Sequence, residues 1–167
     1  AAGERTIWSL SDSFISPFRP VHSTYVMLYG YSEAQFIAVF QALKENTSVK
    51  HIQFKLGERH CTQGCALVAA EYLESSKTLL TLQLGYDGHF QELPAALPLL
   101  VRALSRNTSV TELTICTGVV RFASVTFQEL LTCTQTLQKL KIVGSEAEQL
   151  NEVQIAAITS GFANNTT

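Results

Sequence analysis

The sequence predicts a single α/β domain: a right-handed solenoid, a segment of a horseshoe, with parallel strands on the concave face and helices on the convex face. Two observations predict this fold. A polar turn followed by alternating apolar and polar residues occurs four times, and a degenerate earlier copy is visible. Between the copies the apolar spacing becomes that of a helix. The central apolar residues of the copies recur every 26 to 31 residues, at Val26, Ile52, Leu82, Leu113 and Leu140.

The strands are predicted from the two-residue alternation at the end of each copy. In four segments an apolar residue stands on both sides of a polar one: Ile52 to Phe54, Leu82 to Leu84, Leu113 to Ile115 and Leu140 to Ile142. This is the period of a strand that buries one face. The residues before, between and after these apolar positions are therefore expected on the opposite face of the sheet.

The first and last helices are predicted from their apolar spacing and from their start signals. Residues 32–43 have apolar side chains at three- and four-residue intervals, and Ser32 with Gln35 forms a capping box. Asn151 with Gln154 repeats the same start signal near the end of the sequence. Both segments are expected to be amphipathic helices that pack on the sheet.

Three more helices are expected between the strands. Two of them cover about 65–75 and 124–133. The third ends near Ser105 and contains two prolines, which a helix accepts in its first turn but not further in. We therefore expect a loose start at Pro94 and a regular helix from about Pro98.

Composition bounds the class of protein. Of the 167 residues, 46% are apolar and 16% are charged, and the net charge is −2. This excludes an intrinsically disordered chain, which combines low hydrophobicity with high net charge. A near-neutral charge balance argues against a nucleic-acid partner. The stretches without charge are shorter than the roughly 20 apolar residues that span a bilayer, so no membrane span is expected.

The cysteines and the N-terminal residues predict a cytoplasmic location. The sequence has four cysteines, and a chain of this length does not depend on disulfides as small secreted domains do. Free thiols in a reducing compartment are therefore expected. Residues 1–5 do not begin a signal peptide and are expected to be a processed or truncated end.

The repeated unit resembles the leucine-rich repeats, specifically their ribonuclease-inhibitor-like class. The resemblance is carried by three apolar positions after Asn/Ser-x-Ser/Thr, and by the helix end at residues 43–46 that residues 104–107 echo. It implies about five repeats of roughly 28 residues over 23–167, truncated at the start of the next repeat, and an N-terminal cap formed by 1–22. Glycine-led turns stand where that family places Asn or Cys after the strand: Gly57, Gly85, Gly118 and Gly144.

Catalytic and metal-binding motifs were sought, and none was found. The sequence has no phosphate-binding loop, nucleophile elbow, zinc-protease motif or dinucleotide fingerprint, so neither an enzyme nor a cofactor is expected. His60, Cys61 and Cys65 could supply three metal ligands, but the second ligand pair of a structural zinc site is missing. Asp87 and His89 flank a glycine and are more simply explained as turn residues.

Several asparagines stand in Asn-x-Ser/Thr sequons, which allow two interpretations. They occur at Asn46, Asn107, Asn164 and Asn165. Glycosylation would require secretion. The alternative is that the side chains close the turn of each repeat onto nearby backbone, and this alternative is favoured.

The remaining candidate for function is the concave face, which is expected to bind a protein or peptide. Its side chains fall into columns of polar, aromatic and charged residues. The predicted partner-binding residues are Tyr25, Met27, Tyr29, His51, Gln53, Lys55, Thr81, Gln83, Glu112, Thr114, Lys139 and Lys141. Tyr and Met are common in energetically important contacts between proteins. For Tyr25, Met27 and Tyr29 the alternative is contact with the N-terminal cap.

The predicted function is therefore that of a protein-protein interaction module, a scaffold within a larger protein, whose partner is another protein or a peptide. This step from fold to function is an analogy. An alternative is an intramolecular regulatory segment, autoinhibitory or sensing, of a multidomain immune receptor, ubiquitin-ligase adaptor or bacterial effector. The oligomeric state is left open.

Overall fold

The computed structural model describes residues 25–28, 31–56, 62–86, 96–144 and 149–165. They form a parallel five-stranded sheet in which the strands follow one another in sequence order. The strands are β1 (Tyr25–Leu28), β2 (His51–Leu56), β3 (Thr81–Tyr86), β4 (Glu112–Cys116) and β5 (Lys139–Val143). Because every connection leads to the next position in the sheet, the fold is a stack of strand–helix units.

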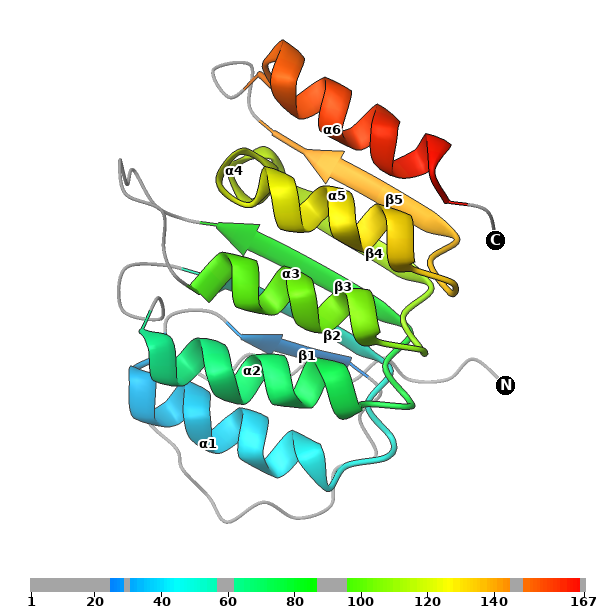
Figure 1. The fold of residues 1–167 in the computed structure, drawn as a ribbon. Coiled ribbons are helices and arrows are strands. Elements are labelled where there is room, and N and C mark those ends of the chain that lie inside the picture. The colour runs from blue at the N-terminus through cyan, green and yellow to red at the C-terminus, as the bar shows by residue number, and fades with distance from the viewer. Residues whose placement is uncertain (1–24, 29–30, 57–61, 87–95, 145–148, 166–167) are drawn as a thin grey trace, which may run out of the picture.

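The helices lie side by side on one face of the sheet (Figure 1). They are α1 (Glu33–Lys44), α2 (Gln63–Ser75), α3 (Ala96–Arg106), α4 (Thr117–Phe122), α5 (Ser124–Cys133) and α6 (Glu152–Ala163). Neighbouring helices are linked at the surface by the ion pairs Lys44–Glu71 and Arg106–Glu74. Exposed pairs of this kind add little stability, so the burial of apolar side chains must hold the layers together.

The predicted register of the strands is confirmed. The central apolar residue of each unit lies beside that of the next, in the pairs Val26↔Ile52, Ile52↔Leu82, Leu82↔Leu113 and Leu113↔Leu140. A shift of one residue would turn every apolar side chain to the other face. The alternating pattern therefore fixes which side chains face the helices.

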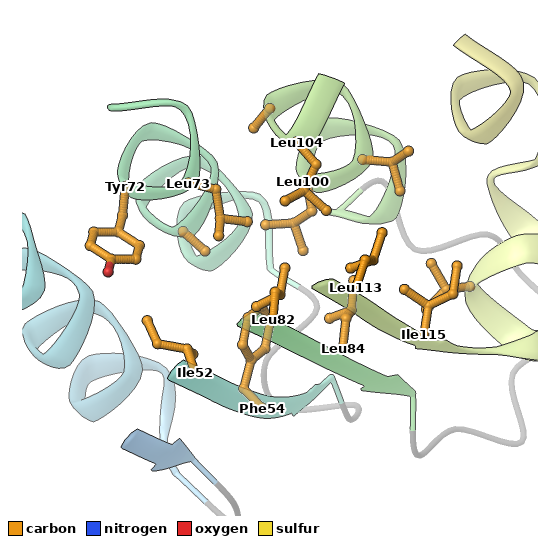
Figure 2. Close-up of a cluster of buried hydrophobic side chains, with 14 of the residues drawn as sticks. Ile52, Phe54, Tyr72, Leu73, Leu82, Leu84, Leu100, Leu104, Leu113 and Ile115 are labelled. Atoms are coloured by element: carbon orange, nitrogen blue, oxygen red, sulfur yellow. The ribbon is translucent and has the colours of Figure 1, made fainter. Parts of the chain in front are cut away.

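The hydrophobic core lies between the sheet and the helices. Side chains of β2, β3 and β4 point toward those of α2 and α3 (Figure 2). Phe40 makes edge contacts with Phe54 and Tyr72, at centroid distances of 5.5 and 5.7 Å. Full burial of one Leu, Ile or Phe stabilises a fold by about 1.5–3 kcal/mol. Each unit buries side chains against its neighbours, so the stability of a unit depends on the adjoining ones.

The helix starts follow the predicted caps, with one addition. Ser32 and Asn151 each form a complete capping box, with Gln35 and Gln154 respectively. In α2, Thr62 Oγ1 accepts a hydrogen bond from the backbone N–H of Cys65 at 3.2 Å, a cap that the sequence analysis did not identify. Because Thr62 caps the helix, α2 begins at residue 63, slightly before the expected start.

The helices differ from the expectations in two respects. The regular part of α3 begins at Ala96, so Pro98 lies within the first turn, where its missing N–H costs no hydrogen bond; Pro94 lies outside the described residues. The short helix α4 directly precedes α5 and was not predicted. Its six residues are too few to show a helical period.

Two of the turns between a helix and the next strand are closed by asparagine side chains, those of Asn46 and Asn107. Asn107 Oδ1 accepts from the backbone N–H groups of Ser109 and Val110 at 2.8 and 2.7 Å. Its Nδ2 donates to the carbonyl oxygens of Leu73 and Ser76 in the preceding unit. Asn107 is buried, and its Nδ2, the atom that would carry a glycan, is already engaged. The turn-closing interpretation of this sequon is therefore the one that the fold supports.

The expected glycine-led turns are wrong at two positions. Gly85 lies within β3 and Gly118 within α4. At Gly85 a Cβ atom would lie 2.8 Å from Cγ of Lys55. This glycine therefore leaves room for a neighbouring side chain. Gly57, like the proposed cap at 1–22, lies outside the described residues.

Three cysteines fall within the described part of the chain. Cys65, Cys116 and Cys133 are free thiols, as predicted for these positions; Cys61 lies outside the described residues. No helix in the described ranges has both the length and the apolar character needed to cross a membrane.

Candidate functional site: the open face of the sheet

The face of the sheet opposite the helices, here called the open face, carries the predicted partner-binding residues. In β2, Ile52 and Phe54 are buried beneath the helices, His51 and Gln53 are half-buried, and Lys55 is exposed. Because side chains alternate along a strand, residues 51, 53 and 55 face away from the core. The corresponding residues of the other strands complete the open face. They are residues 25 and 27 of β1, 81, 83 and 85 of β3, 112, 114 and 116 of β4, and 139, 141 and 143 of β5.

Backbone pairing brings these side chains into the predicted columns. One column contains Tyr25, His51, Thr81, Glu112 and Lys139, and the next contains Met27, Gln53, Gln83, Thr114 and Lys141. Lys55 lies beside Gly85 in a third column. Neighbouring strands are about 4.8 Å apart, so each column forms a continuous surface. Tyr29, the remaining predicted residue, lies outside the described residues.

The β1–β2 end of the open face is an ordered aromatic cluster. The rings of Tyr25 and His51 are stacked at a centroid distance of 6.3 Å with an interplanar angle of 29°. The hydroxyl of Tyr25 donates a 2.6 Å hydrogen bond to Oε1 of Gln53. Side chains that are already held in place lose less conformational entropy when a partner binds. This cluster is therefore suited to act as a rigid anchor.

The β4–β5 end of the open face is charged. Lys139 Nζ lies 3.2 Å from Glu112 Oε2, and both side chains are substantially exposed. Lys141 is exposed in the adjacent column, next to Thr114. Since Glu112 and Lys139 offset each other, Lys141 gives this end a net positive charge. Between the two ends, Thr81 and Gln83 are uncharged, while Lys55 of β2 adds a further cation in the third column.

Among the residues that the structure describes, the two titratable groups with shifted pKa values lie away from the open face. Burial raises the pKa of the Cys65 thiol, an effect that its contact with Thr62 partly offsets and that nearby Glu33 increases. Burial also raises the pKa of the Tyr72 hydroxyl. Both residues belong to α2. A raised pKa disfavours the thiolate, the reactive form of cysteine, so Cys65 is suited to packing rather than to nucleophilic chemistry.

Metal binding finds no support in the ranges that the structure covers. Within them, no three His, Cys, Asp or Glu side chains are grouped so that they could hold a metal ion. Two of the three candidate metal ligands, His60 and Cys61, lie outside the described residues. The separate pair Asp87 and His89 also lies outside them. Cys65 is buried in α2, and its thiol donates a long 3.9 Å contact to the carbonyl oxygen of Glu33.

The solved structures that share this fold include a leiomodin and a tropomodulin domain. The first is described as "Leiomodin-1 Actin-Binding Site 2 (ABS2)"; it has a TM-score of 0.57 and 21% sequence identity, and the alignment covers 85% of this chain and 80% of that one. The second is the tropomodulin C-terminal domain of Caenorhabditis elegans, with a TM-score of 0.57, 13% identity and coverage of 85% and 83%. No protein-family model matches the chain, and a search of curated proteins finds no match.

These comparisons correct the family resemblance. The similar structures are a leiomodin actin-binding site and a tropomodulin C-terminal domain, not ribonuclease-inhibitor-like leucine-rich-repeat proteins, so that assignment was wrong. The pattern behind it specifies a polar turn and a half-buried strand, which any stack of parallel strand–helix units requires. The architecture that is shown is a mixed α/β fold with a parallel five-stranded sheet.

Sequence reasoning missed a set of exposed apolar side chains on the helices. Val125 of α5 and Val153, Ile155 and Phe162 of α6 are each at least half exposed. In the sequence, Ile155 and Phe162 look like core residues because they stand at the apolar positions of an amphipathic helix. The sequence of α6 alone does not distinguish these exposed side chains from the buried ones of the earlier helices. The distinction requires the burial that the structure gives.

Proposed function

We propose that this chain is a protein-binding module that contacts its partner through the open face of the sheet. One observation carries the proposal: the helices cover one face, while the other presents ordered columns of aromatic, polar and charged side chains. The stacked Tyr25 and His51 form the anchor, and the cationic end around Lys141 provides charge selectivity. Aromatic anchors supply most of the affinity in many interfaces, while charges at the rim set specificity.

Actin is the first partner to test. The support is the name of the leiomodin-1 structure, which describes an actin-binding site and aligns over 85% of this chain. A shared fold does not by itself transfer a function. The proposal of protein binding therefore depends on the side chains of the open face, and the choice of actin is what the experiment tests. The module acts without a cofactor.

The same proposal makes the chain a binding module rather than an enzyme. Its support is that, within the described ranges, the shifted pKa values belong to Cys65 and Tyr72, which are packed residues of α2. Catalytic groups, by contrast, are usually gathered in a cleft. The free thiols of Cys65, Cys116 and Cys133 support a cytoplasmic location.

The test is co-sedimentation of the chain with actin filaments, together with titration of labelled monomeric actin. The open-face variant combines Tyr25→Ala, His51→Ala and Lys139→Ala. Its matched control combines Gln41→Ala, Gln63→Ala and Arg102→Ala, which remove one cation and two polar side chains from exposed positions on the helices.

We expect the control to bind as the original chain does and the open-face variant to bind at least about tenfold more weakly, which corresponds to about 1.4 kcal/mol. Circular dichroism checks that both variants are folded. If the original chain does not bind actin, the assignment of actin is wrong. If the helix control alone loses binding, the open face is not the site.

A further inference from the structure

The open face of the sheet is positively charged, whereas the helix layer is not. Among the described residues, the open face carries Lys55, Lys139 and Lys141 and one acidic side chain, Glu112, which gives it a net charge of +2. The six helices contain five glutamates and four lysines or arginines. Since the whole chain has a net charge of −2, the sign of the charge on the open face is opposite to that of the chain.

The lysines of β5 belong to the face of the sheet and not to its edge. Lys139 and Lys141 lie beside Glu112 and Thr114 of β4, and both lysines are exposed. Pairing of β5 with a further strand would engage the backbone groups at its outer edge, whereas side chains stand roughly perpendicular to a sheet. The two lysines therefore remain on the open face whether or not such a strand lies beside β5.

Lys55 leans from β2 across the open face. Its neighbour in β3 is Gly85, which has no side chain to fill the third column. A Cβ atom at Gly85 would lie 2.8 Å from Cγ of Lys55 and 3.7 Å from its Cδ, so the stem of the lysine lies over β3. A long lysine stem can cover neighbouring surface while its charged end stays in water. The absence of a side chain at Gly85 thus lets the cation of β2 lean in the direction of β5.

An uncharged strip separates Lys55 from Lys141. It contains Gln83 of β3 and Thr114 of β4, which lie side by side; Gln83 is exposed and Thr114 is half-buried. The strands β2 and β5 are three spacings of about 4.8 Å apart, or about 14 Å. Carboxylates at alternate positions of an extended chain are about 6.6 Å apart, so two of them fit over this strip between the two lysine side chains.

Glu112 determines which column an acidic partner can follow. It lies in the first column, between Thr81 and Lys139, and its Oε2 is 3.2 Å from Nζ of Lys139. A carboxylate placed beside Glu112 would be repelled by it and would compete with it for Lys139. The second column has no acidic side chain in the described strands and includes Lys141. The second column is therefore the more favourable path for negative charge.

We propose that the partner of the open face contributes an acidic, extended segment that runs across the strands along the second column. Two carboxylates at alternate positions of the segment lie over Gln83 and Thr114, between Lys55 and Lys141. An apolar residue about 14 Å away, or about four extended residues, contacts Met27 at the other end of the column. This inference rests on the proposed function, because it takes the open face as the binding surface and names the chemistry that the partner presents there.

A nucleic acid fits this face less well than an acidic protein segment does. Complexes with nucleic acids neutralise several phosphates, which follow one another closely along each strand. Three lysines with a glutamate among them match a few spaced carboxylates better than a continuous row of phosphates. An oligonucleotide is therefore the competing ligand in the experiment.

The test uses three labelled peptides of seven residues with the 167-residue chain. The first is Leu-Ser-Ser-Ser-Glu-Ser-Glu, and the second has Lys in place of each Glu. The third, Ser-Ser-Ser-Ser-Glu-Leu-Glu, keeps the composition of the first but moves the leucine between the glutamates. Fluorescence anisotropy measures affinity, and backbone NMR shifts locate the site. We expect the first peptide to bind most tightly, the third to bind several-fold more weakly and the second not to bind.

The NMR shifts and the salt dependence are separate readouts of the same site. The largest shifts on addition of the first peptide are expected in the strands and not in the helices. Raising the salt concentration from 0.1 to 1 M shortens the screening length from about 10 to about 3 Å. We expect this change to weaken the first peptide at least about fivefold, because its contacts with the lysines are exposed to solvent.

Two open-face variants change the charge in opposite directions. Lys141→Gln is expected to weaken the first peptide about threefold. Glu112→Gln removes a repulsion and releases Lys139, so it is expected to tighten binding about threefold, a gain that partial unfolding cannot produce. The matched controls are Arg102→Gln and Glu129→Gln, which make the same changes at exposed positions of the helices and should leave binding unchanged.

Failure of this inference can be told from failure of the proposed function. Equal affinity for the first and second peptides, or no binding of the first at millimolar concentration, would overturn the acidic segment, while loss of actin binding in the open-face variant would still support the open face. Shifts confined to the helices would overturn the placement of the segment on the sheet. Displacement of the first peptide by a twelve-nucleotide single-stranded DNA at a lower concentration than by the unlabelled peptide would assign the lysines to nucleic acid instead.

Discussion

The Tyr25 hydroxyl on β1 donates a 2.6 Å hydrogen bond to Oε1 of Gln53 on β2. This bond joins two columns of the open face, because Tyr25 lies opposite His51 and Gln53 lies opposite Met27. The same tyrosine ring stacks on His51. The bond therefore fixes the orientation of the ring that we propose as the anchor for a partner.

Tyr25→Phe tests the contribution of this bond. The variant keeps the ring and removes the donor, and one hydrogen bond of this kind contributes about 1 kcal/mol. We expect the free energy of unfolding, measured by urea denaturation, to fall by about that amount. Tyr25→Ala, which also removes the stacking with His51, should cost more. Equal stability of Tyr25→Phe and the original chain would contradict a stabilising role for this bond.

Asn107→Ala is expected to be one of the more destabilising single substitutions. The side chain accepts from Ser109 and Val110 and donates to Leu73 and Ser76 while buried. Groups left unsatisfied in a buried position cost about 1–3 kcal/mol each. A loss of at least about 2 kcal/mol is therefore expected in thermal or chemical unfolding.

The comparison for Asn107→Ala is Thr108→Ala, at the exposed next position of the same turn. The side-chain hydroxyl of Thr108 accepts a hydrogen bond from the exposed Lys77. A change of less than about 0.5 kcal/mol is expected for this surface substitution. Similar losses in the two variants would contradict the role assigned to the Asn107 side chain.

Gly161→Ala tests the close packing of α6 on α5. A Cβ atom at Gly161 would lie 2.7 Å from Cβ of Leu131 and 3.2 Å from the carbonyl oxygen of Gln128. Neither atom can move without shifting backbone, and overpacking of this kind costs about 1–3 kcal/mol. This exceeds the gain of about 0.5–1 kcal/mol from replacing a helical glycine, so the variant should unfold more easily.

Gly64→Ala is the matched control for Gly161→Ala. Gly64 is also helical, but the nearest atom to an added Cβ is Oε1 of Glu33 at 3.4 Å, at the end of a flexible side chain. The variant should be as stable as the original chain or slightly more so. If both alanine variants behave alike in unfolding experiments, helix packing does not decide the effect.

The periodic part of the fold could be predicted from the sequence. Alternation around Ile52, Leu82, Leu113 and Leu140 determined which face each strand buries, and the observed pairing places these residues side by side. The open-face columns follow from the same alternation. Register errors are costly in such a sheet, which is why a local pattern was enough.

Features that depend on three-dimensional neighbours could not be predicted. Gly85 looks like a turn residue, but it lies in β3, where the Lys55 side chain occupies the space that a Cβ would need. Phe162 looks like a core residue, but it is exposed because no described strand lies under α6 at that point. The family assignment failed for a related reason, since the strand pattern reports burial and not ancestry.

The thiols of Cys65 and Cys133 are expected to differ in reactivity. Cys133 is exposed at the end of α5, whereas Cys65 is buried and burial raises the pKa of its thiol. Alkylation requires both access and the thiolate form. In the folded chain at pH 8, iodoacetamide should therefore modify Cys133 much faster than Cys65, as followed by mass spectrometry of the peptides.

The raised pKa of Cys65 also gives the sign of a pH effect on stability. Above the pKa of an unfolded thiol, about 8.5, the unfolded chain loses this proton while the folded chain retains it. The contribution of the Cys65 thiol to the free energy of unfolding is thus fully present below that pH. It is lost as the pH rises toward the pKa of the thiol in the folded chain. Cys65→Ala should show a smaller loss of unfolding free energy between pH 8 and 10 than the original chain. Equal alkylation rates of Cys65 and Cys133 in the folded chain would contradict the protection of the Cys65 thiol by burial.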